Sequence, residues 1–219
     1  MSVSFALSRE QVQHKADARA FARGTLAPLM ARVRAERDPE TRAGLMKPAV
    51  EAAVAAGMLR SLIPAPFGGT AASGVDAAIL IEELAAESPD FFITLAGPLI
   101  ALAPVYEVGT ADQIARFVAP FLASTGAPVA AMAFSEPEGS ANFGAPAPAA
   151  GVTTTAVPDG DEWVINGRKA WSSLLPGWDG DGPDIMTIVC RTPGGVSVVV
   201  AEREHLAGHI EVEEFYDLP

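Results

Sequence analysis

Two segments of the chain place hydroxyl and aromatic side chains together where strands are predicted to end. The first runs through Met132 and Phe134 to Ser135, and the second carries Trp171 and Ser173. A strand that ends in Phe-Ser offers backbone amides and a hydroxyl at one edge. A segment that ends in Trp-Ser-Ser offers a flat apolar wall with a hydroxyl beside it. Such a set suits a planar, conjugated ligand that needs hydrogen-bond donors along its rim.

A bound flavin is a ligand of this kind, because the protein supplies its orientation and electrostatics. Its N5 atom needs a hydrogen-bond donor, its pyrimidine edge needs donors for the charge gained on reduction, and its ring needs an apolar wall. Gly139 and Ser140 follow the first segment, where a bare backbone and a hydroxyl can approach a pyrophosphate. These segments therefore offer groups of the kind that a flavin nucleotide needs.

Simpler structural roles stay open for several residues of these segments. Trp171 can equally pack in a core, as strand aromatics often do. Trp163 alternates with Val164 in a predicted strand and is expected in the core. Glu136, at a strand end, is expected to accept hydrogen bonds from nearby amides. Cys190 lies in an apolar run and is expected to be an inert, buried thiol.

Other common chemical motifs are absent from the sequence. There is neither a G-x-G-x-x-G fingerprint nor a Walker A loop. Asn142 stands where the second glycine of a G-x-S-x-G nucleophile elbow belongs. His205 and His209 are four positions apart, but Gly208 weakens a helix there and a third ligand is not evident. We interpret them as surface or capping histidines and expect no metal site.

The composition restricts the classes of function. The chain has 15 Lys and Arg against 27 Asp and Glu, a formal charge of −12, which argues against nucleic-acid binding. A single cysteine allows no intrachain disulfide and fits a cytoplasmic protein. The N-terminus lacks a secretory signal pattern. The most apolar stretch, residues 91–106, is shorter than the about 20 residues of a membrane span and holds two prolines, so we expect a buried helix and no membrane partner.

The pattern of residues changes near position 125, from helical spacing of Ala, Leu, Glu and Arg to β-branched residues, Gly and Pro. We therefore expect an α+β protein with an N-terminal all-α domain over 1–124 and a middle β domain over 125–219. Ser8 and Gln11 form a capping box that predicts a first helix to about residue 37, bent at Pro28. Further helices are predicted over 39–57, along an apolar stripe at 77, 80, 81, 84 and 85, from position 89, and over 110–122.

Strands are predicted in the second half of the chain from β-branched and apolar runs. Asn166-Gly167 is a strong hairpin signal, and we expect it to return the chain through residues 169–173 as a strand. A Pro-Gly-Gly sequence at 193–195 predicts a second hairpin. The predicted strands cover residues 128–134, 152–157, 162–165, 185–190 and 196–202.

Both chemical segments resemble signatures of the acyl-CoA dehydrogenase superfamily. Ser135-Glu136-Pro137 with Gly139-Ser140 is similar to its T-E-P-x-x-G-S-D signature, one residue shorter and ending in Ala141-Asn142. Asn166-Gly167-x-Lys169-x-Trp171-x-Ser173 is similar to its N-G-x-K-x-W-I-T/S signature. Either match alone is weak, but the pair occurs in the family's order, helices first and β domain second. The resemblance implies a helical N-terminal domain followed by a β-barrel-like middle domain.

Finer details resemble the nitroalkane oxidase branch, which keeps the fold and FAD but oxidises neutral nitroalkanes to carbonyl compounds. They include Glu162-Trp163-Val164-Ile165, Gly177-Trp178-Asp179 and Val189-Cys190-Arg191. The resemblance implies FAD as the cofactor. It implies that Met132, Phe134 and Ser135 contact the flavin ring, that Ser140 lies near the phosphates, and that Trp171 and Ser173 lie near the ring and N5.

The implied activity is that of an FAD-dependent oxidoreductase, in which a carboxylate removes an α-proton while hydride or electrons pass to flavin N5. In the family that base lies in a C-terminal four-helix domain, which we expect to be absent from these 219 residues, so the catalytic residue is unknown. The expected substrate is a small molecule, a nitroalkane or an acyl-CoA thioester. The expected assembly is a homo-oligomer or a complex with a partner chain that supplies the helical domain. The alternatives are an acyl-CoA dehydrogenase proper and a catalytically silent, truncated module that binds such a partner.

Overall fold

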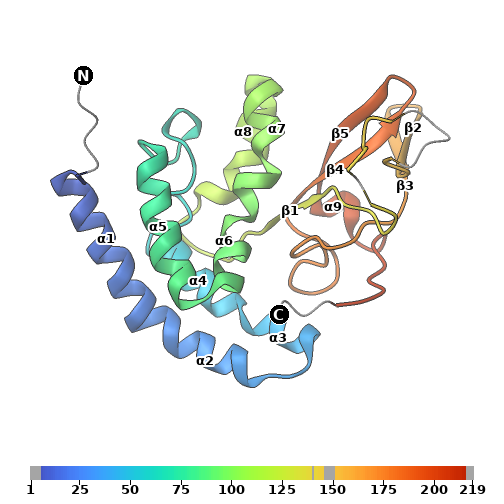
Figure 1. Ribbon diagram of the computed structural model, residues 1–219. Coiled ribbons are helices and arrows are strands. Elements are labelled where there is room, and N and C mark those ends of the chain that lie inside the picture. The colour runs from blue at the N-terminus through green and yellow to red at the C-terminus, as the bar shows by residue number, and fades with distance from the viewer. Residues whose placement is uncertain (1–5, 140, 146–150, 216–219) are drawn as a thin grey trace. The chain divides into compact units, whose positions relative to one another are not determined.

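The computed structural model describes residues 6–139, 141–145 and 151–215. Helices come first along the chain and strands follow, which confirms the α+β class (Figure 1). The described chain divides into two compact units. The helical unit holds the residues up to Ala96 together with Val118–Ala127, and the sheet unit holds Gly97–Phe117 and the residues from Pro128 onward. The expected domain boundary between residues 124 and 125 stays a prediction.

The first helix begins at the predicted capping box. The Gln11 amide donates to Ser8 Oγ (3.2 Å), and the Ser8 amide donates to Gln11 Oε1 (3.0 Å). The bend comes just before Pro28, which has no N–H to donate into a regular helical ladder. There the spacing between hydrogen-bonded residues along the helix widens, and the Ala27 amide donates to the Ala22 carbonyl. The segments are α1 Arg9–Phe21, a π-helical turn Ala22–Leu26 and α2 Ala27–Ala35.

The predicted helix over 39–57 is split by Pro48, which lies in the first turn of its second half. A left-handed Gly57 (φ 74°) follows that half, as expected for a glycine beyond a helix C-terminus. The two pieces are α3 Pro39–Leu45 and α4 Lys47–Ala55, and a short 3-10 turn, Ala65–Phe67, lies in the following loop.

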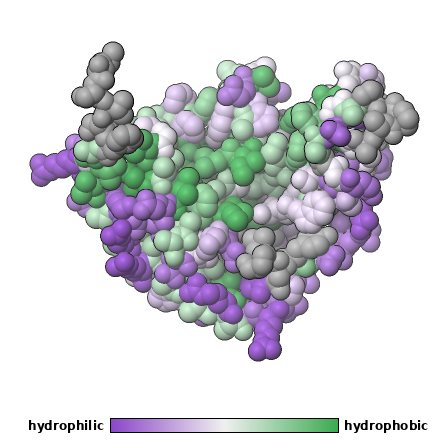
Figure 2. Space-filling view, in the orientation of Figure 1, coloured by the Kyte–Doolittle hydropathy of each residue, from purple (hydrophilic) through white to green (hydrophobic). Residues whose placement is uncertain are grey.

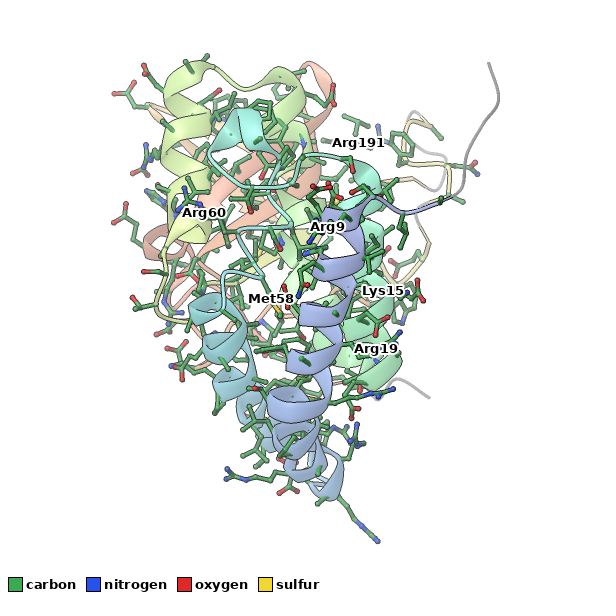
Figure 3. All side chains as sticks on the ribbon, turned by 90° about the vertical axis from the view of Figure 1, so that its left-hand side faces the viewer. Arg9, Lys15, Arg19, Met58, Arg60 and Arg191 are labelled. Atoms are coloured by element: carbon green, nitrogen blue, oxygen red, sulfur yellow. The ribbon has the colours of Figure 1, made fainter. Side chains whose placement is uncertain are left out.

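The helix α5, Gly74–Glu87, carries a buried stripe that differs from the predicted one. Leu80 and Leu84 are buried as expected, but Ile79 and Glu83 are buried in place of Ile81. A carboxylate is tolerated there because α1 supplies cations to it. Lys15 and Arg19 project from α1 toward α5, and Arg19 Nε donates to Glu83 Oε2 over 2.8 Å (Figure 3).

The apolar stretch Pro89–Val108 is long and apolar enough to cross a membrane by length and composition, and 44% of it is buried within the protein. Phe91, Leu102 and Val105 are among its buried side chains, so packing accounts for part of its composition. In the sheet unit, Thr187 Oγ1 donates to the Ala101 carbonyl (2.5 Å) and attaches the end of this stretch to the sheet. The elements are α6 Pro89–Ala101, α7 Ala103–Val108, α8 Ala111–Val118 and the 3-10 turn Ala119–Leu122.

Among the described residues, the sheet unit contains, besides the helical residues of Gly97–Phe117, a five-stranded sheet and a short helix near its C-terminal end, seen in yellow to red in Figure 1. The longest pair is an antiparallel hairpin that turns at Pro193 and Gly194, as predicted. Its first strand is buried from Ile185 to Cys190 and pairs on its other edge with two different strands. The elements are β1 Ala130–Ala133, β2 Thr155–Asp159, β3 Glu162–Asn166, β4 Ile185–Thr192, β5 Gly195–Glu202 and α9 Arg203–Leu206.

The strands β1 and β2 pair with the same edge of β4, one after the other along its length. β1 runs parallel to β4 and pairs with it as far as Ala133, opposite Ile188. β2 meets β4 at Thr155, opposite Arg191. Between these two pairings, β4 presents the backbone of Val189 to a space that neither strand fills. The sheet therefore has an interruption next to its central strand, at the point where the segment of Phe134 and Ser135 leaves β1.

The expected hairpin at Asn166-Gly167 is wrong. Gly167 is absent from the residues of positive φ, and the chain after β3 forms no returning strand among the described residues. The hairpin forms instead one strand earlier, where Asp159 pairs with Glu162 around a left-handed Gly160. A Cβ on Gly167 would lie 2.3 Å from Thr154 Oγ1, so this glycine serves a close approach of two backbones and not a turn.

The expected burial of Trp163 is also wrong. Trp163 is 48% exposed, and Val157 and Val164 on the same hairpin are exposed as well. Trp163 shares a face with Ile165, which packs against the sheet core, but it lies nearer the turn, beyond the part of that face that is covered. The alternation of residues predicted that Trp163 and Ile165 lie on one face of the strand. It could not predict how much of that face other elements cover.

Gly167→Ala is expected to lower the free energy of unfolding by about 1–3 kcal/mol, because the new methyl group would overlap the Thr154 side chain and Cα. Gly194→Ala is the matched control, since its Cβ would meet only Thr192 Oγ1 at an ordinary 3.7 Å. We expect the control to change stability by less than about 0.5 kcal/mol. Urea unfolding followed by circular dichroism measures both, and equal effects would contradict the assigned role of Gly167.

Candidate functional site

The candidate site lies where β1 leaves β4, within the sheet unit. The interruption in the sheet is occupied by the side chain of Lys169 from the segment after β3. Its ammonium donates to the carbonyl oxygens of Val189 (2.6 Å) and Phe134 (3.2 Å) and to Glu136 Oε1 (2.8 Å). An ammonium has three N–H donors, so these acceptors use all of them. Lys169 thus takes the place of the ladder hydrogen bonds that a strand would have made.

Glu136 receives hydrogen bonds from the start of the β2 segment as well as from Lys169. The amides of Thr153 and Thr154 donate to its two carboxylate oxygens over 2.7 Å and 3.0 Å, and both threonine hydroxyls donate too. Its side chain is 1% exposed and that of Lys169 is 9% exposed. The structure therefore confirms that Glu136 binds nearby amides, and adds a buried ion pair that sequence analysis did not predict.

Burial by itself would raise the pKa of Glu136, because it disfavours the charged form. The hydrogen bonds from Lys169, Thr153 and Thr154 outweigh that effect and lower the pKa to about 2. Glu136 is therefore ionised at neutral pH. A carboxylate held in this way is a poor proton acceptor, which fits a structural part in the site and not that of a catalytic base.

A backbone hydrogen bond joins the two chemical segments directly. The amide of Ala170 donates to the carbonyl of Ser135 over 2.9 Å. The next residue, Trp171, has φ 56° and is 62% exposed. A left-handed conformation costs a non-glycine residue about 1–2 kcal/mol, and packing of its side chain does not offset that cost here. The alternative in which Trp171 packs in a core is therefore wrong.

The predicted site residues fall into two groups around this hydrogen bond. Met132 lies on β1 and is half-buried, as are Phe134 and Ser135 beyond its end. The ring of Phe134 meets the ring of Phe143 edge-on at 5.7 Å between centroids. The remaining predicted residues are Trp171, exposed beside Ala170; Ser173, exposed in the following turn; and Ser140, which lies outside the described residues.

The structure brings the backbones of the two segments together at Ser135 and Ala170. Among the described residues, no hydrogen bond joins Ser135 to Ser173. The exposed positions of Trp171 and Ser173 leave their side chains able to contact a ligand. The arrangement offers half-buried apolar surface, an exposed indole and hydroxyls at its border.

Arg191 organises the other side of this region and was also missed as a site residue. Its Nε donates to the Val152 carbonyl (2.6 Å), and its guanidinium also bonds the Ala145 carbonyl. A Cβ on Gly151 would lie 2.8 Å from the same guanidinium. Arg191 thus holds the backbone on both sides of residues 146–150. Its place in a strand next to Cys190 gave no local signal of that role.

Cys190 is fully buried, as predicted. Burial raises the pKa of its thiol, and the nearby Lys169 charge lowers it by less. A buried thiol with a raised pKa is a poor nucleophile, which agrees with the expected inert role.

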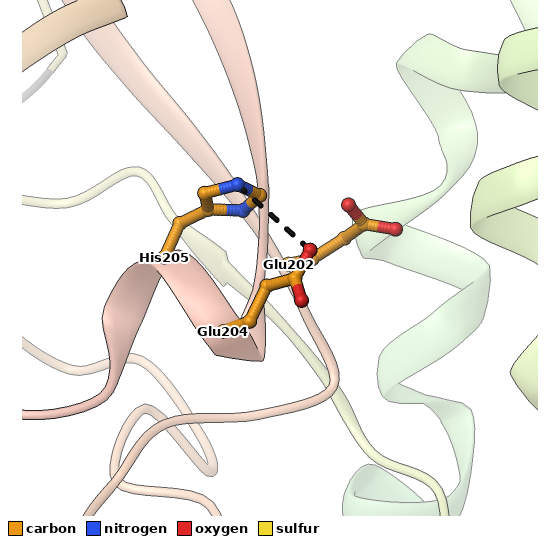
Figure 4. Close-up of side chains that lie close together, drawn as sticks. All are labelled: Glu202, Glu204 and His205. Atoms are coloured by element: carbon orange, nitrogen blue, oxygen red, sulfur yellow. Dashed lines mark ion pairs between the residues drawn. The ribbon is translucent and has the colours of Figure 1, made fainter.

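One cluster of metal-ligating side chains occurs in the described chain, made by Glu202, Glu204 and His205 (Figure 4). Arg116 already binds the carboxylate of Glu202, with Nε 2.9 Å from Oε1. His205 Nε2 lies 3.9 Å from Glu204 Oε1, and both side chains are exposed. Surface ion pairing accounts for this cluster. His209 is exposed and lies outside it.

Shallow hollows with polar linings occur in the described part of the helical unit. A hollow of about 220 Å³ is lined by Glu10, His14, Ser61, Thr70 and Asp76. Another, of about 310 Å³, lies along the ion pairs between α1 and α5. Much of the outward surface of α1 and α2 is hydrophilic, as Figure 2 shows in purple. These hollows contain none of the residues that carry the predicted chemistry.

The fold and the paired motifs agree with a comparison of the chain with protein families. Residues 8–125, more than half of the chain, match the family model described as "Acyl-CoA dehydrogenase, N-terminal domain". The chain belongs to the acyl-CoA dehydrogenase superfamily. This confirms the resemblance drawn from the two motif segments.

The relatives of this superfamily member include nitroalkane oxidases of two fungi. The chain is 36% identical to that of Fusarium oxysporum over 192 residues, 86% of this chain and 43% of the relative. It is 38% identical to that of Podospora anserina over 196 residues, 87% of this chain and 44% of the relative. A solved structure of the flavoprotein nitroalkane oxidase superposes with a TM-score of 0.87 at 33% identity, covering 94% of this chain and 51% of that one.

The chain therefore spans about half the length of the relatives that it matches. Its matches also include a probable acyl-CoA dehydrogenase of Mycobacterium leprae, 32% identical over 167 residues, 76% of this chain and 39% of the relative. The relatives thus include both nitroalkane oxidases and an acyl-CoA dehydrogenase. The similarity extends over the helices and the sheet alike.

The ion pair predicts how the stability of this superfamily member depends on pH. Glu136 has a pKa near 2 in the folded chain against an ordinary 4.5, so its ionised form stabilises the fold above pH 4.5 and this contribution is lost as pH falls toward 2. The difference corresponds to about 3 kcal/mol at neutral pH. Glu136→Gln is therefore expected to lower stability most at pH 7 and progressively less toward pH 2, measured by urea unfolding at each pH.

Glu83→Gln is the matched control, because hydrogen bonds from Arg19 and Lys15 outweigh its burial and also lower the Glu83 pKa to about 2. We expect it to show the same pH trend in the helical unit. A stability difference for Glu136→Gln that is constant from pH 7 to pH 2 would contradict the assigned ion pair.

Proposed function

We propose that this chain provides flavin-binding parts of an FAD-dependent oxidoreductase of the nitroalkane oxidase type. The observation that carries the proposal is the hydrogen bond from the Ala170 amide to the Ser135 carbonyl, which joins the two segments that resemble the family's flavin signatures. The similarity to nitroalkane oxidases over 86% and 87% of the chain supports the same choice.

The residues around the joined segments fit a flavin by their chemistry. Half-buried Met132 and Phe134 offer apolar surface, and the exposed Trp171 offers a planar wall. Ser135 and Ser173 supply hydroxyl groups, and both are accessible to solvent at least in part. The exposed left-handed backbone at Trp171 is a strained feature of the kind that clusters at ligand sites.

We propose that Met132, Phe134 and Ser135 contact the ring, that Ser140 lies near the phosphates, and that Trp171 and Ser173 lie near the ring and N5. A bound FAD would supply the acceptor for the electrons that leave the substrate. The role of this chain is to bind and orient the ring, to donate hydrogen bonds to its rim and to exclude water from one of its faces. These contributions lower the cost of positioning the reactants before the chemical step.

Removal of the substrate's α-proton needs a base within hydrogen-bond reach of the carbon acid. Glu136 cannot supply it, because its carboxylate is buried and already holds Lys169 and two threonines. The proposal therefore assigns the base to a part of the enzyme outside these residues. The substrate is proposed to be a small neutral nitroalkane, with an acyl-CoA thioester as the alternative that the mycobacterial relative supports.

A second candidate is a catalytically silent module that binds a partner helical domain. The specific observation in its favour is the hairpin of β2 and β3, where Val157, Val164 and Trp163 are 46–55% exposed. Exposed apolar surface of this kind is typical of interfaces. Gel filtration distinguishes the candidates in the first instance, since a stable monomer that binds FAD would argue against the silent module.

The purified chain is expected to stay yellow after it is saturated with FAD and the free FAD is removed by gel filtration. The double variant Ser135→Ala/Ser173→Ala is expected to raise the FAD dissociation constant by about 10–100-fold, because it removes two hydrogen bonds worth about 0.5–1.5 kcal/mol each. Titration followed by flavin absorbance and fluorescence measures this change.

Ser124→Ala is the control, because Ser124 is exposed in a loop of the helical unit. It is expected to leave the dissociation constant within about twofold of the original. A chain that binds no FAD in the titration would rule out the proposed function, and an unchanged affinity of the double variant would rule out the assigned hydroxyls.

A further inference from the structure

The interruption in the sheet is closed by side-chain chemistry instead of by a strand. β1 stops pairing with β4 at Ala133, and β2 begins to pair only at Thr155. In the space between them, one ammonium binds the carbonyls of Phe134 and Val189 and the carboxylate of Glu136. The contacts of Lys169 therefore join β4 to the segment that leaves β1.

The same ion pair stands directly beside the hydrogen bond between the two chemical segments. Glu136 follows Ser135, and Lys169 precedes Ala170, so the ion pair and the backbone bond join the same two stretches of chain. The amides of Thr153 and Thr154 donate to the two carboxylate oxygens of Glu136 and fix its orientation. Rotation of either stretch would break several of these bonds at once.

We propose that Lys169 and Glu136 are positioning residues for the flavin, which hold the Phe134–Ser135 strand end beside the segment of Trp171 and Ser173 before the cofactor binds. This inference rests on the proposed function. It assigns to the pair no contact with the cofactor and no chemical step. The ion pair holds the hydroxyl groups of Ser135 and Ser173 and the indole of Trp171 in one fixed arrangement.

Packing alone gives these segments little support. Ala170 is buried, but Trp171 is 62% exposed and Ser173 is exposed, while Phe134 and Ser135 are only half-buried. A surface segment with few buried contacts opens readily unless polar bonds hold it. The buried ion pair is the strongest bond of this kind at the junction, because hydrogen bonds between charged groups are the strong ones.

The test must separate positioning from simple loss of folding. Removal of one charge leaves the other buried without its partner, which is strongly destabilising by itself. The double variant Glu136→Gln/Lys169→Met removes both charges and keeps the side-chain sizes. Arg116→Met/Glu202→Gln is the matched control, an ion pair of the same unit whose arginine side chain is 58% exposed.

The two double variants are compared by circular dichroism melting and by FAD titration. We expect both to melt cooperatively, the control to keep the FAD dissociation constant within twofold, and Glu136→Gln/Lys169→Met to raise it at least tenfold. We also expect its bound flavin to lose the fine structure of its visible absorbance. A folded double variant that binds FAD within twofold of the original, with the same spectrum, would overturn the proposal.

A second measurement needs no substitution and decides the matter even where the variant fails to fold. Hydrogen exchange at the Ala170 amide reports the bond to Ser135 in the original chain, with and without FAD. We expect slow exchange in both states, because the ion pair holds the junction in advance. Fast exchange without FAD and slow exchange with it would overturn the proposal, since the cofactor would then be what orders the junction.

The outcomes also separate this inference from the proposed function. An original chain that binds no FAD contradicts the proposed function and the positioning role together. An original chain that binds FAD, with a double variant that binds equally well, contradicts the positioning role alone.

Discussion

The arrangement of the sheet unit depends on one buried ion pair that substitutes for a missing strand pairing. Wherever a strand leaves a sheet, its neighbour is left with backbone groups that need partners, since buried polar groups without hydrogen bonds are costly. Here Lys169 supplies them and Glu136 neutralises its charge. Neither residue would be tolerated alone in this position, because an isolated buried charge costs far more than a paired one.

The contrast with the other ion pairs of the chain shows why this one matters. Arg116 binds Glu202 at the surface, where solvent screens the charges and the expected contribution to stability is small. Lys15 and Arg19 bind Glu83 between two helices that already pack along their length. At the junction of Ser135 and Ala170 the surrounding side chains are half-buried or exposed, so the ion pair carries a larger share of the local order.

Membership of the superfamily relates the ion pair and its surroundings to the proposed flavin site. The chain matches nitroalkane oxidases over most of its own length and about half of theirs. Within that half lie the apolar surface, the hydroxyl groups and the exposed indole that we propose for the flavin. We propose that this chain binds and orients the flavin and that groups elsewhere remove the proton from the substrate. The low pKa of Glu136 agrees with that proposal, since it leaves the carboxylate of the site unsuited to accept a proton.

The sequence alone determined the features that arise between near neighbours. The capping box at Ser8, the break before Pro28 and the turn after Thr192 follow from local bonding and from the missing N–H of proline. The two motif segments, read together, also identified the superfamily and indicated the region that we propose for the site. That Glu136 binds amides was predicted from its place at a strand end, although the amides that it binds, those of Thr153 and Thr154, lie 17 and 18 positions further along the chain.

Only the tertiary structure decided the partners that are distant in sequence. Lys169 stands 33 positions from Glu136, and Gly167 touches Thr154 across two strands, so no local pattern distinguishes these roles from a surface lysine or a turn glycine. The exposure of Trp163 and Trp171 likewise depends on how far other elements extend over them. Local spacing fixes which way a side chain points, whereas the closing of long loops fixes what it meets there.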